Sequence, residues 1–525
     1  MEDFRDMGIK IKTSDNFDIG IIPIEKFTRS MYGYDLVNAL LFIQRINADL
    51  KDSVCKKVYI LSPYVPQYLD KWFLITTEAN AFIAKYLINF SSEIQHGKYD
   101  AHCHSNNVIY YHHLESDLHC LIPEDPQAYK WCIRAMNQQF HYLRVPNHIA
   151  GRYLILFDKI KIREVDAINS MFAEGFGLKP HDIMIIGICM YTVILQNKII
   201  DLKNLINHCI DSPTAKNVLT EEKIEKFLDI YSIDIEGFKN ESLKWKVPAS
   251  ITPLFKYEFN PLWSYPIIRT NRIFESDKKY IVPSLVDLLY ACTEGIYYKL
   301  MDKFKTRGGN LFSEKFGKVF QEYVGYLLRE ANIVFESCDN DNSGNNPRPD
   351  YLIRGSDRVI QVEVKKRVMS NEARACVGDK LDVYIDELVE DIYRQVFKPS
   401  GGYRGYKVYN LIVAMDEWYY FEEKIKPIIE DKLNRKRKED DIPEFKFHLL
   451  GCTDFEILCQ FLKEKKEADI FELFREKGED PAYYYKGLSH VLSEKYAYNP
   501  SEVSFTAAEF DNLFDSFLGS CKVDP

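Results

Sequence analysis

The stretch Pro349–Lys366 reads PDYLIRGSDRVIQVEVKK, and its two arms are expected to form a β-hairpin. Apolar and polar residues alternate in the second arm, so Glu363 and Lys365 share one face of a strand. The segment Gly355–Asp357 has the Gly, Ser and Asp composition of a tight turn. Asp350 stands at the mouth of the hairpin. We therefore predict that the carboxylates of Asp350 and Glu363 and the ammonium of Lys365 converge at a sheet edge.

The segments around this hairpin predict an alternation of helices and strands. Glu314–Glu330 has apolar residues at helical spacing, and Ser313 is a candidate N-cap. A short strand is expected at Ile333–Glu336, a second amphipathic helix at Leu381–Phe397, and an apolar strand at Val408–Met415. With the hairpin included, the expected order is helix, three strands, helix, strand.

Pro349-Asp350, twelve intervening residues and Glu363-Val364-Lys365 resemble the signature of the PD-(D/E)xK nuclease superfamily, which includes many restriction endonucleases. The common core of that superfamily has the element order expected here for residues 312–415. The resemblance implies an α/β fold with a restriction-endonuclease-like core, in which a mixed central sheet is flanked by helices. A large mixed α+β N-terminal region would precede this core, and a helical C-terminal tail would follow it.

Phosphodiester hydrolysis requires an activated water and neutralisation of charge on the phosphate, and a divalent cation supplies both. Mg²⁺ prefers one or two carboxylates together with waters and substrate phosphates. The expected metal ligands are Asp350, Glu363 and the backbone carbonyl of Val364, with Mn²⁺ as an alternative to Mg²⁺. Lys365 is expected to orient or deprotonate the attacking water, or to stabilise the phosphate.

Weaker candidates surround these residues. Glu322 falls almost opposite the apolar stripe of the first helix, so its access to a metal is not expected to be good. RecB-like members of the superfamily carry Gln and Tyr one turn apart on the second helix, whereas here Gln395 is followed by Phe397-Lys398-Pro399. Gln321 and Glu322 stand where many members of the superfamily carry an acidic metal ligand, and the candidates for substrate contact are Gln361, Lys366, Arg367, Arg394 and Gln395.

The chain has 525 residues, so more than one domain is expected. Proline and small residues suggest a boundary at 247–250, which gives an N-terminal region at 1–246, a nuclease-like domain at 250–475 and a tail at 476–525. The net charge of −10 does not favour strong nonspecific nucleic-acid binding, although a local basic cleft is compatible with it. The absence of a signal-peptide core and of CxxC pairs favours a reducing, cytoplasmic location.

The N-terminal region has no identifiable fold. Helices are expected at Tyr34–Asn47 and Glu78–Glu93, and strands at Val108–His112 and Tyr153–Phe157. The longest apolar stretch, Ile183–Leu195, is too short to suggest a membrane span. Zinc ligands are one interpretation of the local histidines and cysteines, and packed or surface side chains are the other. These residues are His102, Cys103, His104, His112, His113, His119, Cys120, Cys132, His141 and His148.

Two functions are compatible with these features. The first is a Mg²⁺-dependent endonuclease, acting on DNA more than RNA, whose N-terminal region recognises a target or regulates cleavage. Bacterial defence against foreign DNA is a natural setting by analogy. The second is a catalytically inactive nuclease-fold module that binds nucleic acid or a partner protein, and a homo-oligomer is compatible with either. A chance Glu–Lys pair on an ordinary solvated hairpin is the remaining interpretation.

Overall fold

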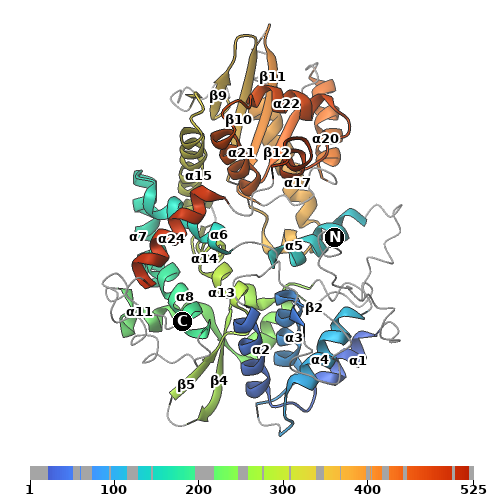
Figure 1. Ribbon diagram of the computed structural model, residues 1–525, viewed down its shortest axis with the longest axis vertical. Coiled ribbons are helices and arrows are strands. Elements are labelled where there is room, and N and C mark those ends of the chain that lie inside the picture. Colours follow the sequence, from blue (N-terminus) through green and yellow to red (C-terminus); the bar gives the residue numbers. More distant parts are fainter. Residues whose placement is uncertain are drawn as a thin grey trace. The chain divides into compact units, whose positions relative to one another are not determined.

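The computed structural model describes residues 22–50, 59–60, 74–93, 96–114, 128–142, 146–195, 218–245, 258–274, 277–306, 309–338, 348–366, 368–397, 403, 405–416, 425–440, 446–498 and 503–518. The protein is a mixed α/β protein (Figure 1). Its chain forms two compact units. The first unit comprises Met1–Tyr153, Ser170–Lys303 and Phe510–Pro525, and the second comprises Leu154–Asn169 and Phe304–Glu509. The boundary expected at 247–250 lies outside the described residues.

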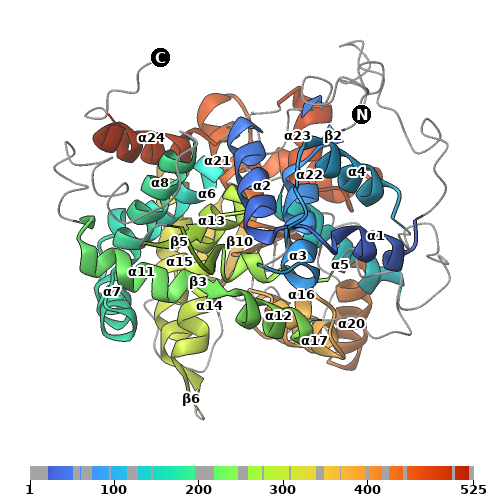
Figure 2. The same cartoon turned by 90° about the horizontal axis from the view of Figure 1, so that it is seen from below.

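The first unit is mainly helical. Figure 2 shows α2, α3 and α4 side by side, and α3 contacts both of the others. The helices that lie wholly or partly in this unit are α1 (Ile24–Met31), α2 (Leu36–Leu50), α3 (Thr77–Phe90), α4 (Ala101–His112), α5 (Ala128–His141), α6 (Pro146–Leu154), α7 (Arg163–Phe176), α8 (Pro180–Leu195), α11 (Glu221–Tyr231), α12 (Ile235–Lys244), α13 (Leu285–Ala291), α14 (Glu294–Lys303) and α24 (Ser504–Leu518).

Short strands complete the first unit. A mixed sheet has β3 (Ser232–Asp234) parallel to β4 (Ile267–Phe274), and β4 antiparallel to β5 (Asp277–Ile281). The strands β1 (Tyr59–Ile60) and β2 (Leu74–Ile75) form a separate antiparallel pair. Among the described helices, no single one is long and apolar enough to cross a membrane, and only the bent pair α7 and α8 reaches that length and composition together.

The helices expected at Tyr34–Asn47 and Glu78–Glu93 are confirmed as α2 and α3. The strands expected at Val108–His112 and Tyr153–Phe157 are wrong. The first of these segments lies in α4, and the second runs from α6 into a π-helical turn, η5 (Ile155–Lys159). Short apolar runs do not distinguish a buried strand from a buried helix, and tertiary packing decides between them.

The second unit is built on a five-stranded mixed sheet in the order β12-β11-β10-β9-β8. The strands are β8 (Glu336–Ser337), β9 (Tyr351–Arg354), β10 (Arg358–Lys365), β11 (Lys407–Ala414) and β12 (Phe447–Leu450). The hairpin of β9 and β10 is confirmed as antiparallel, β10 is parallel to β11, and β11 is parallel to β12. Because β10 is the middle strand, the expectation that the charged residues gather at a sheet edge is wrong.

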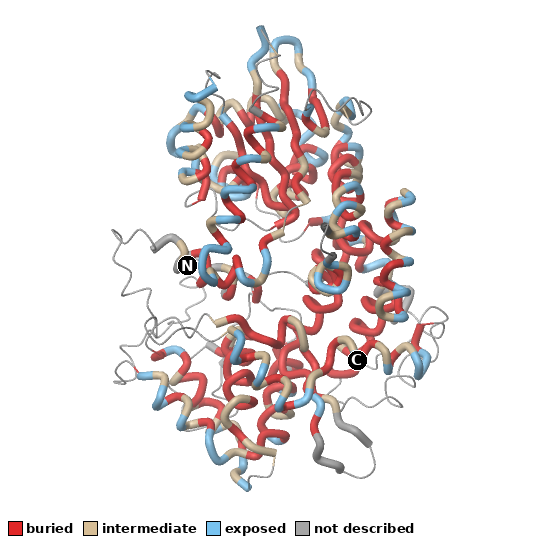
Figure 3. Tube along the Cα trace, turned by 180° about the vertical axis from the view of Figure 1, so that it is seen from behind, coloured by how far each residue is buried: buried red, intermediate tan, exposed pale blue. Residues whose placement is uncertain are grey.

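Helices cover both faces of this sheet. The helix α15 (Leu311–Glu330) contacts β10 and also α21 (Cys452–Glu464), which contacts β11 and β12. The helix α17 (Lys380–Ile392) continues into a π-helical turn, η8 (Tyr393–Phe397), that contacts β10. The strands between the helices are largely buried (Figure 3). The remaining elements are α16 (Asn371–Arg374), α20 (Lys426–Glu439), α22 (Ile470–Glu479), α23 (Leu488–Tyr496) and the short pair β6 (Lys305–Thr306) and β7 (Gly309–Asn310).

The start of α15 differs from the sequence expectation. Asn310 is the N-cap, because its side chain accepts a 3.1 Å hydrogen bond from the backbone N–H of Ser313. Ser313 therefore lies inside the first turn, and the predicted cap is wrong by three residues. The buried side of the helix carries the expected apolar residues. It includes Phe316, Val319, Phe320, Tyr323, Val324, Leu327 and Leu328.

Candidate functional site

The hairpin register brings Asp350 close to the C-terminal end of β10. Val362 pairs with Tyr351, and the backbone N–H of Val364 donates a 2.7 Å hydrogen bond to Oδ2 of Asp350. The turn is closed by a 2.8 Å hydrogen bond from the Gly355 N–H to the Arg358 carbonyl. The carboxylate of Asp350 is therefore held against the strand at the residue that follows Glu363.

Glu363 is 3% exposed, which is unusual for a carboxyl group. Its Oε1 accepts a 2.8 Å hydrogen bond from Nζ of Lys365. Its Oε2 is buried and has no hydrogen-bond partner among the described residues. Burial and, to a smaller extent, the charge of Asp350 raise the pKa of Glu363 to about 8, while Lys365 opposes both effects. This carboxyl group thus has an unsatisfied oxygen and a strong electrostatic reason to attract a cation.

The π-helical turn η8 places the side chain of Gln395 beside Lys365. Oε1 of Gln395 accepts a hydrogen bond from Nζ of Lys365, so the lysine bridges the central strand and the second helix. Single π-helical turns are rare and often occur at functional sites, because the extra residue redirects the side chains that follow. Gln395, a secondary candidate in the sequence, therefore belongs to the same cluster as Lys365.

Asp391 was not identified from the sequence. Its charge contributes to the raised pKa of Glu363, which places it near the cluster, and it pairs with Arg394 at 3.8 Å. The sequence did contain a signal for it, since Asp391 precedes Gln395 by four residues and such residues share a helix face. The side chain of Arg394 is 61% exposed.

Two other candidates, Gln361 and Gln321, make different contacts. Gln361 is fully buried and donates a 2.9 Å hydrogen bond to Asn410, its partner on β11, so it contributes to pairing inside the sheet. The carbonyl of Gln321 accepts a hydrogen bond from Tyr351, and its side chain accepts one from Lys318.

Glu322 pairs with Arg329 on the surface of α15, consistent with its position opposite the apolar stripe. The side-chain carbons of Lys366 lie beside Gly317 of α15, where a Cβ would come within 2.7 Å of them. Arg367 lies outside the described residues.

A second buried acid fixes the chain beyond the ends of β10 and β11. Oδ1 of Asp416 accepts a 2.8 Å hydrogen bond from Arg374, and Oδ2 accepts one of 3.2 Å from Tyr384. The backbone N–H of Met369 also donates to Oδ2. Because these groups are paired and buried, Asp416 fastens the segment that follows Lys365 to the end of β11.

Of the candidate histidines in the first unit, His102 and His112 are exposed, whereas His104 and His141 are buried and packed. His104 is buried, and its two ring nitrogens lie 3.0 Å from the Tyr99 hydroxyl and 3.1 Å from Oδ1 of Asn80. Burial lowers the pKa of His104 to about 3, so the ring stays neutral. His141 contacts Asp287 at 2.8 Å in a buried pair. Both ring nitrogens of His104 and Nε2 of His141 are therefore engaged within the protein.

Among the described residues, no group of three or more His, Cys, Asp or Glu side chains is arranged to hold a metal ion. His119 and Cys120 lie outside these residues, as does the side chain of Cys132. Asp350 and Glu363 are only two carboxylates, so they do not form a group of three. Two can suffice for Mg²⁺, which commonly completes its coordination shell with waters and phosphate oxygens.

No protein-family model matches this chain, and no curated protein or solved structure matches it either.

Proposed function

We propose that the second unit is a metal-dependent nuclease of the PD-(D/E)xK type, which hydrolyses phosphodiester bonds in nucleic acid, DNA in preference to RNA. The observation that carries the proposal is the contact set of three residues. Asp350 is bonded to the strand at Val364, and Glu363 and Lys365 are 2.8 Å apart on that strand. Two acids and an amine gathered around one mostly buried position are typical of phosphoryl-transfer sites rather than of a solvated hairpin.

The arrangement of elements supports the same proposal. The helix α15, the strands β8, β9 and β10, the helix α17 and the strand β11 follow one another in the order expected of a restriction-endonuclease-like core. The sheet around them is mixed, and helices pack on it. We therefore assign this core to residues 312–415 as part of the proposal.

The residues present fit a hard divalent cation such as Mg²⁺ or Mn²⁺. Asp350, Glu363 and the backbone carbonyl of Val364 would hold it, and the unpartnered Oε2 of Glu363 is the oxygen that most needs such a partner. When bound, such a cation neutralises charge on the phosphate and lowers the pKa of a bound water.

Among the protein's own side chains, Lys365 is the one that acts on the water or the phosphate. Its ammonium carries three N–H donors, and two of them are directed to Glu363 and Gln395. We assign the third to the attacking water or to a phosphate oxygen, where a fixed positive charge stabilises the transition state. The bonds to Glu363 and Gln395 keep the ammonium in one orientation, so little rearrangement is needed during the reaction.

The test is cleavage of plasmid DNA and of single-stranded RNA by the full chain, with Mg²⁺ and with EDTA. Asp350→Asn and Lys365→Met should each reduce cleavage by at least about a hundredfold, given the usual contribution of such groups. Asp386→Asn and Lys463→Met are matched controls, because both residues form exposed ion pairs elsewhere in the second unit. These controls should cleave like the unsubstituted protein.

Two results would contradict the proposal. Equal cleavage by Asp350→Asn and the unsubstituted protein would show that the activity resides elsewhere. Absence of Mg²⁺-dependent cleavage, together with retained binding of DNA, would favour the inactive nucleic-acid-binding module.

A further inference from the structure

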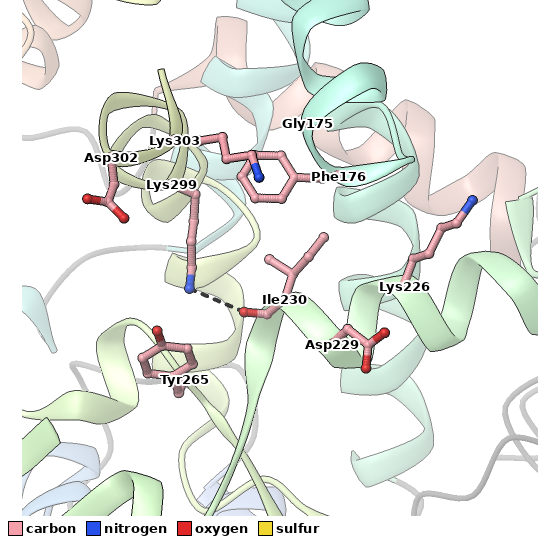
Figure 4. A pocket seen from close by; sticks show the side chains of 9 residues that line it. All are labelled: Gly175, Phe176, Lys226, Asp229, Ile230, Tyr265, Lys299, Asp302 and Lys303. Carbon is pink, nitrogen blue, oxygen red and sulfur yellow. Dashed lines mark hydrogen bonds between the residues drawn. The ribbon is translucent and has the colours of Figure 1, made fainter. Parts of the chain in front are cut away.

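A cavity of about 420 Å³ lies in the first unit, between the end of α7, the helix α11 and the end of α14 (Figure 4). This volume falls within the range of about 300–1,000 Å³ that is common for small-molecule sites. The lining contains three lysines, two aspartates and two aromatic rings. The lining residues are Gly175, Phe176, Lys226, Asp229, Ile230, Tyr265, Lys299, Asp302 and Lys303.

Lys299 provides a cation inside the cavity. Its Nζ donates a 3.2 Å hydrogen bond to the carbonyl of Ile230 and lies 4.1 Å from the centre of the Tyr265 ring. Burial lowers the pKa of Lys299 to about 8, although Asp302 opposes the effect. The carboxylates near Lys299 thus do not compensate fully for the burial of its amine. An anion that entered the cavity would be attracted to the charged form of this amine.

The second available cation is Lys303, one turn further along α14. Its Nζ lies 5.8 Å from the centre of the Phe176 ring. Lys226 has a different role, since its ammonium pairs with Glu222 at 2.6 Å. The side-chain carbons of Lys226 pass close to Gly177, where a Cβ would come within 2.9 Å of them. Lys226 therefore contributes an apolar wall, and Lys299 and Lys303 contribute the charge.

The two acids limit how much negative charge the cavity accepts. Asp229 and Asp302 are both exposed, and Figure 4 shows their carboxylates on opposite sides of Lys299. A ligand with several phosphates would extend towards these carboxylates and be repelled. A single anionic group at Lys299, joined to a flat ring that packs on Phe176 or Tyr265, brings less negative charge near Asp302 and Asp229 than a polyphosphate does.

We propose that this cavity binds a small aromatic compound with one phosphate monoester group, and that Lys299 and Lys303 hold the phosphate. This site does not depend on the nuclease proposal, since all of its residues belong to the first unit. Phosphate monoesters carry oxygens that accept several charge-assisted hydrogen bonds, which the two ammonium groups supply.

The test is isothermal titration of the full chain with phenyl phosphate, inorganic phosphate and tripolyphosphate. Phenyl phosphate should bind at least about tenfold more tightly than the other two probes, because only it satisfies both the lysines and the rings. Lys299→Met and Lys303→Met should each weaken its binding by about tenfold or more. Lys239→Met is the control, because Lys239 forms an exposed pair with Glu236 on α12 and should bind normally.

A second measurement distinguishes ligand binding by Lys299 from a purely structural role, in which its hydrogen bond to Ile230 holds the end of α11. A bound phosphate should raise the pKa of Lys299 above about 8, so binding at pH 8.5 should take up protons. Titrations in buffers of different ionisation enthalpy measure this uptake, which Lys299→Met should abolish. Absence of binding by phenyl phosphate, equal binding by tripolyphosphate, or unchanged binding by a folded Lys299→Met protein would each overturn the proposal.

Discussion

Replacing Glu363 with glutamine should change how the stability of the second unit depends on pH. The pKa of this buried carboxyl group is about 8, against an ordinary value of 4.5. In the unfolded chain the group loses its proton near pH 4.5, whereas in the folded protein it keeps the proton until about pH 8. The folded state therefore loses stability as the pH rises through this interval.

The expected size follows from these two values. Each unit of difference between the folded and unfolded pKa corresponds to about 1.4 kcal/mol. The full loss of folding stability above pH 8 is therefore about 5 kcal/mol. Between pH 6 and pH 9 the free energy of unfolding should fall by about 2–3 kcal/mol because of Glu363 alone. Glu363→Gln has no charge to bury, so this part of the pH dependence should disappear.

The assay is urea unfolding of the metal-free protein at pH 6 and pH 9, with EDTA present throughout. Glu467→Gln, at an exposed position, is the matched control and should follow the unsubstituted protein. Saturating Mg²⁺ should restore stability at pH 9 in the unsubstituted protein but not in Glu363→Gln. Parallel pH profiles for Glu363→Gln and the unsubstituted protein would refute the assignment of a raised pKa to this residue.

Three further predictions concern other residues of the second unit. Asp350→Asn should abolish stabilisation by Mg²⁺, which at 100 times the Kd would be about 2.7 kcal/mol in the unsubstituted protein, as thermal unfolding can measure. Gln395→Leu should slow Mg²⁺-dependent cleavage by about 10- to 100-fold while the stabilisation by Mg²⁺ persists, and loss of both would instead indicate damage to the fold. Asn310→Ala should lower the free energy of unfolding by about 1 kcal/mol and Ser313→Ala by clearly less, and the reverse order in urea unfolding would restore Ser313 as the cap.

The hairpin could be predicted because its information is local. Alternating residues in β10 and a Gly-Ser-Asp turn determine which side chains share a face, and Asp350 follows from the register. The position of β10 in the sheet could not be predicted in this way. It depends on pairing with β11, which starts at Lys407, and on β12 beyond it, and no local pattern reports such distant partners.

The helix that completes the site was predicted only in part. Its apolar stripe indicated a helix over Leu381–Phe397, but the change to a π-helical turn at Tyr393 has no periodic signal. That change brings Gln395 to Lys365. The strand predictions for Val108–His112 and Tyr153–Phe157 were wrong for a different reason. Their β-branched and aromatic residues are common in strands, but here tertiary packing favours a helix.

The central position of β10 also has a consequence during synthesis of the protein. When the ribosome has just made Lys365, the strand has its earlier neighbour β9, but Gln395 and the whole of β11 are still missing. At a typical rate of about 5–20 residues per second, several seconds pass before these partners emerge. A nascent or truncated chain that ends before Lys407 therefore lacks the strand that flanks Glu363 on one side, and the surroundings of Glu363 and Lys365 are complete only late in translation.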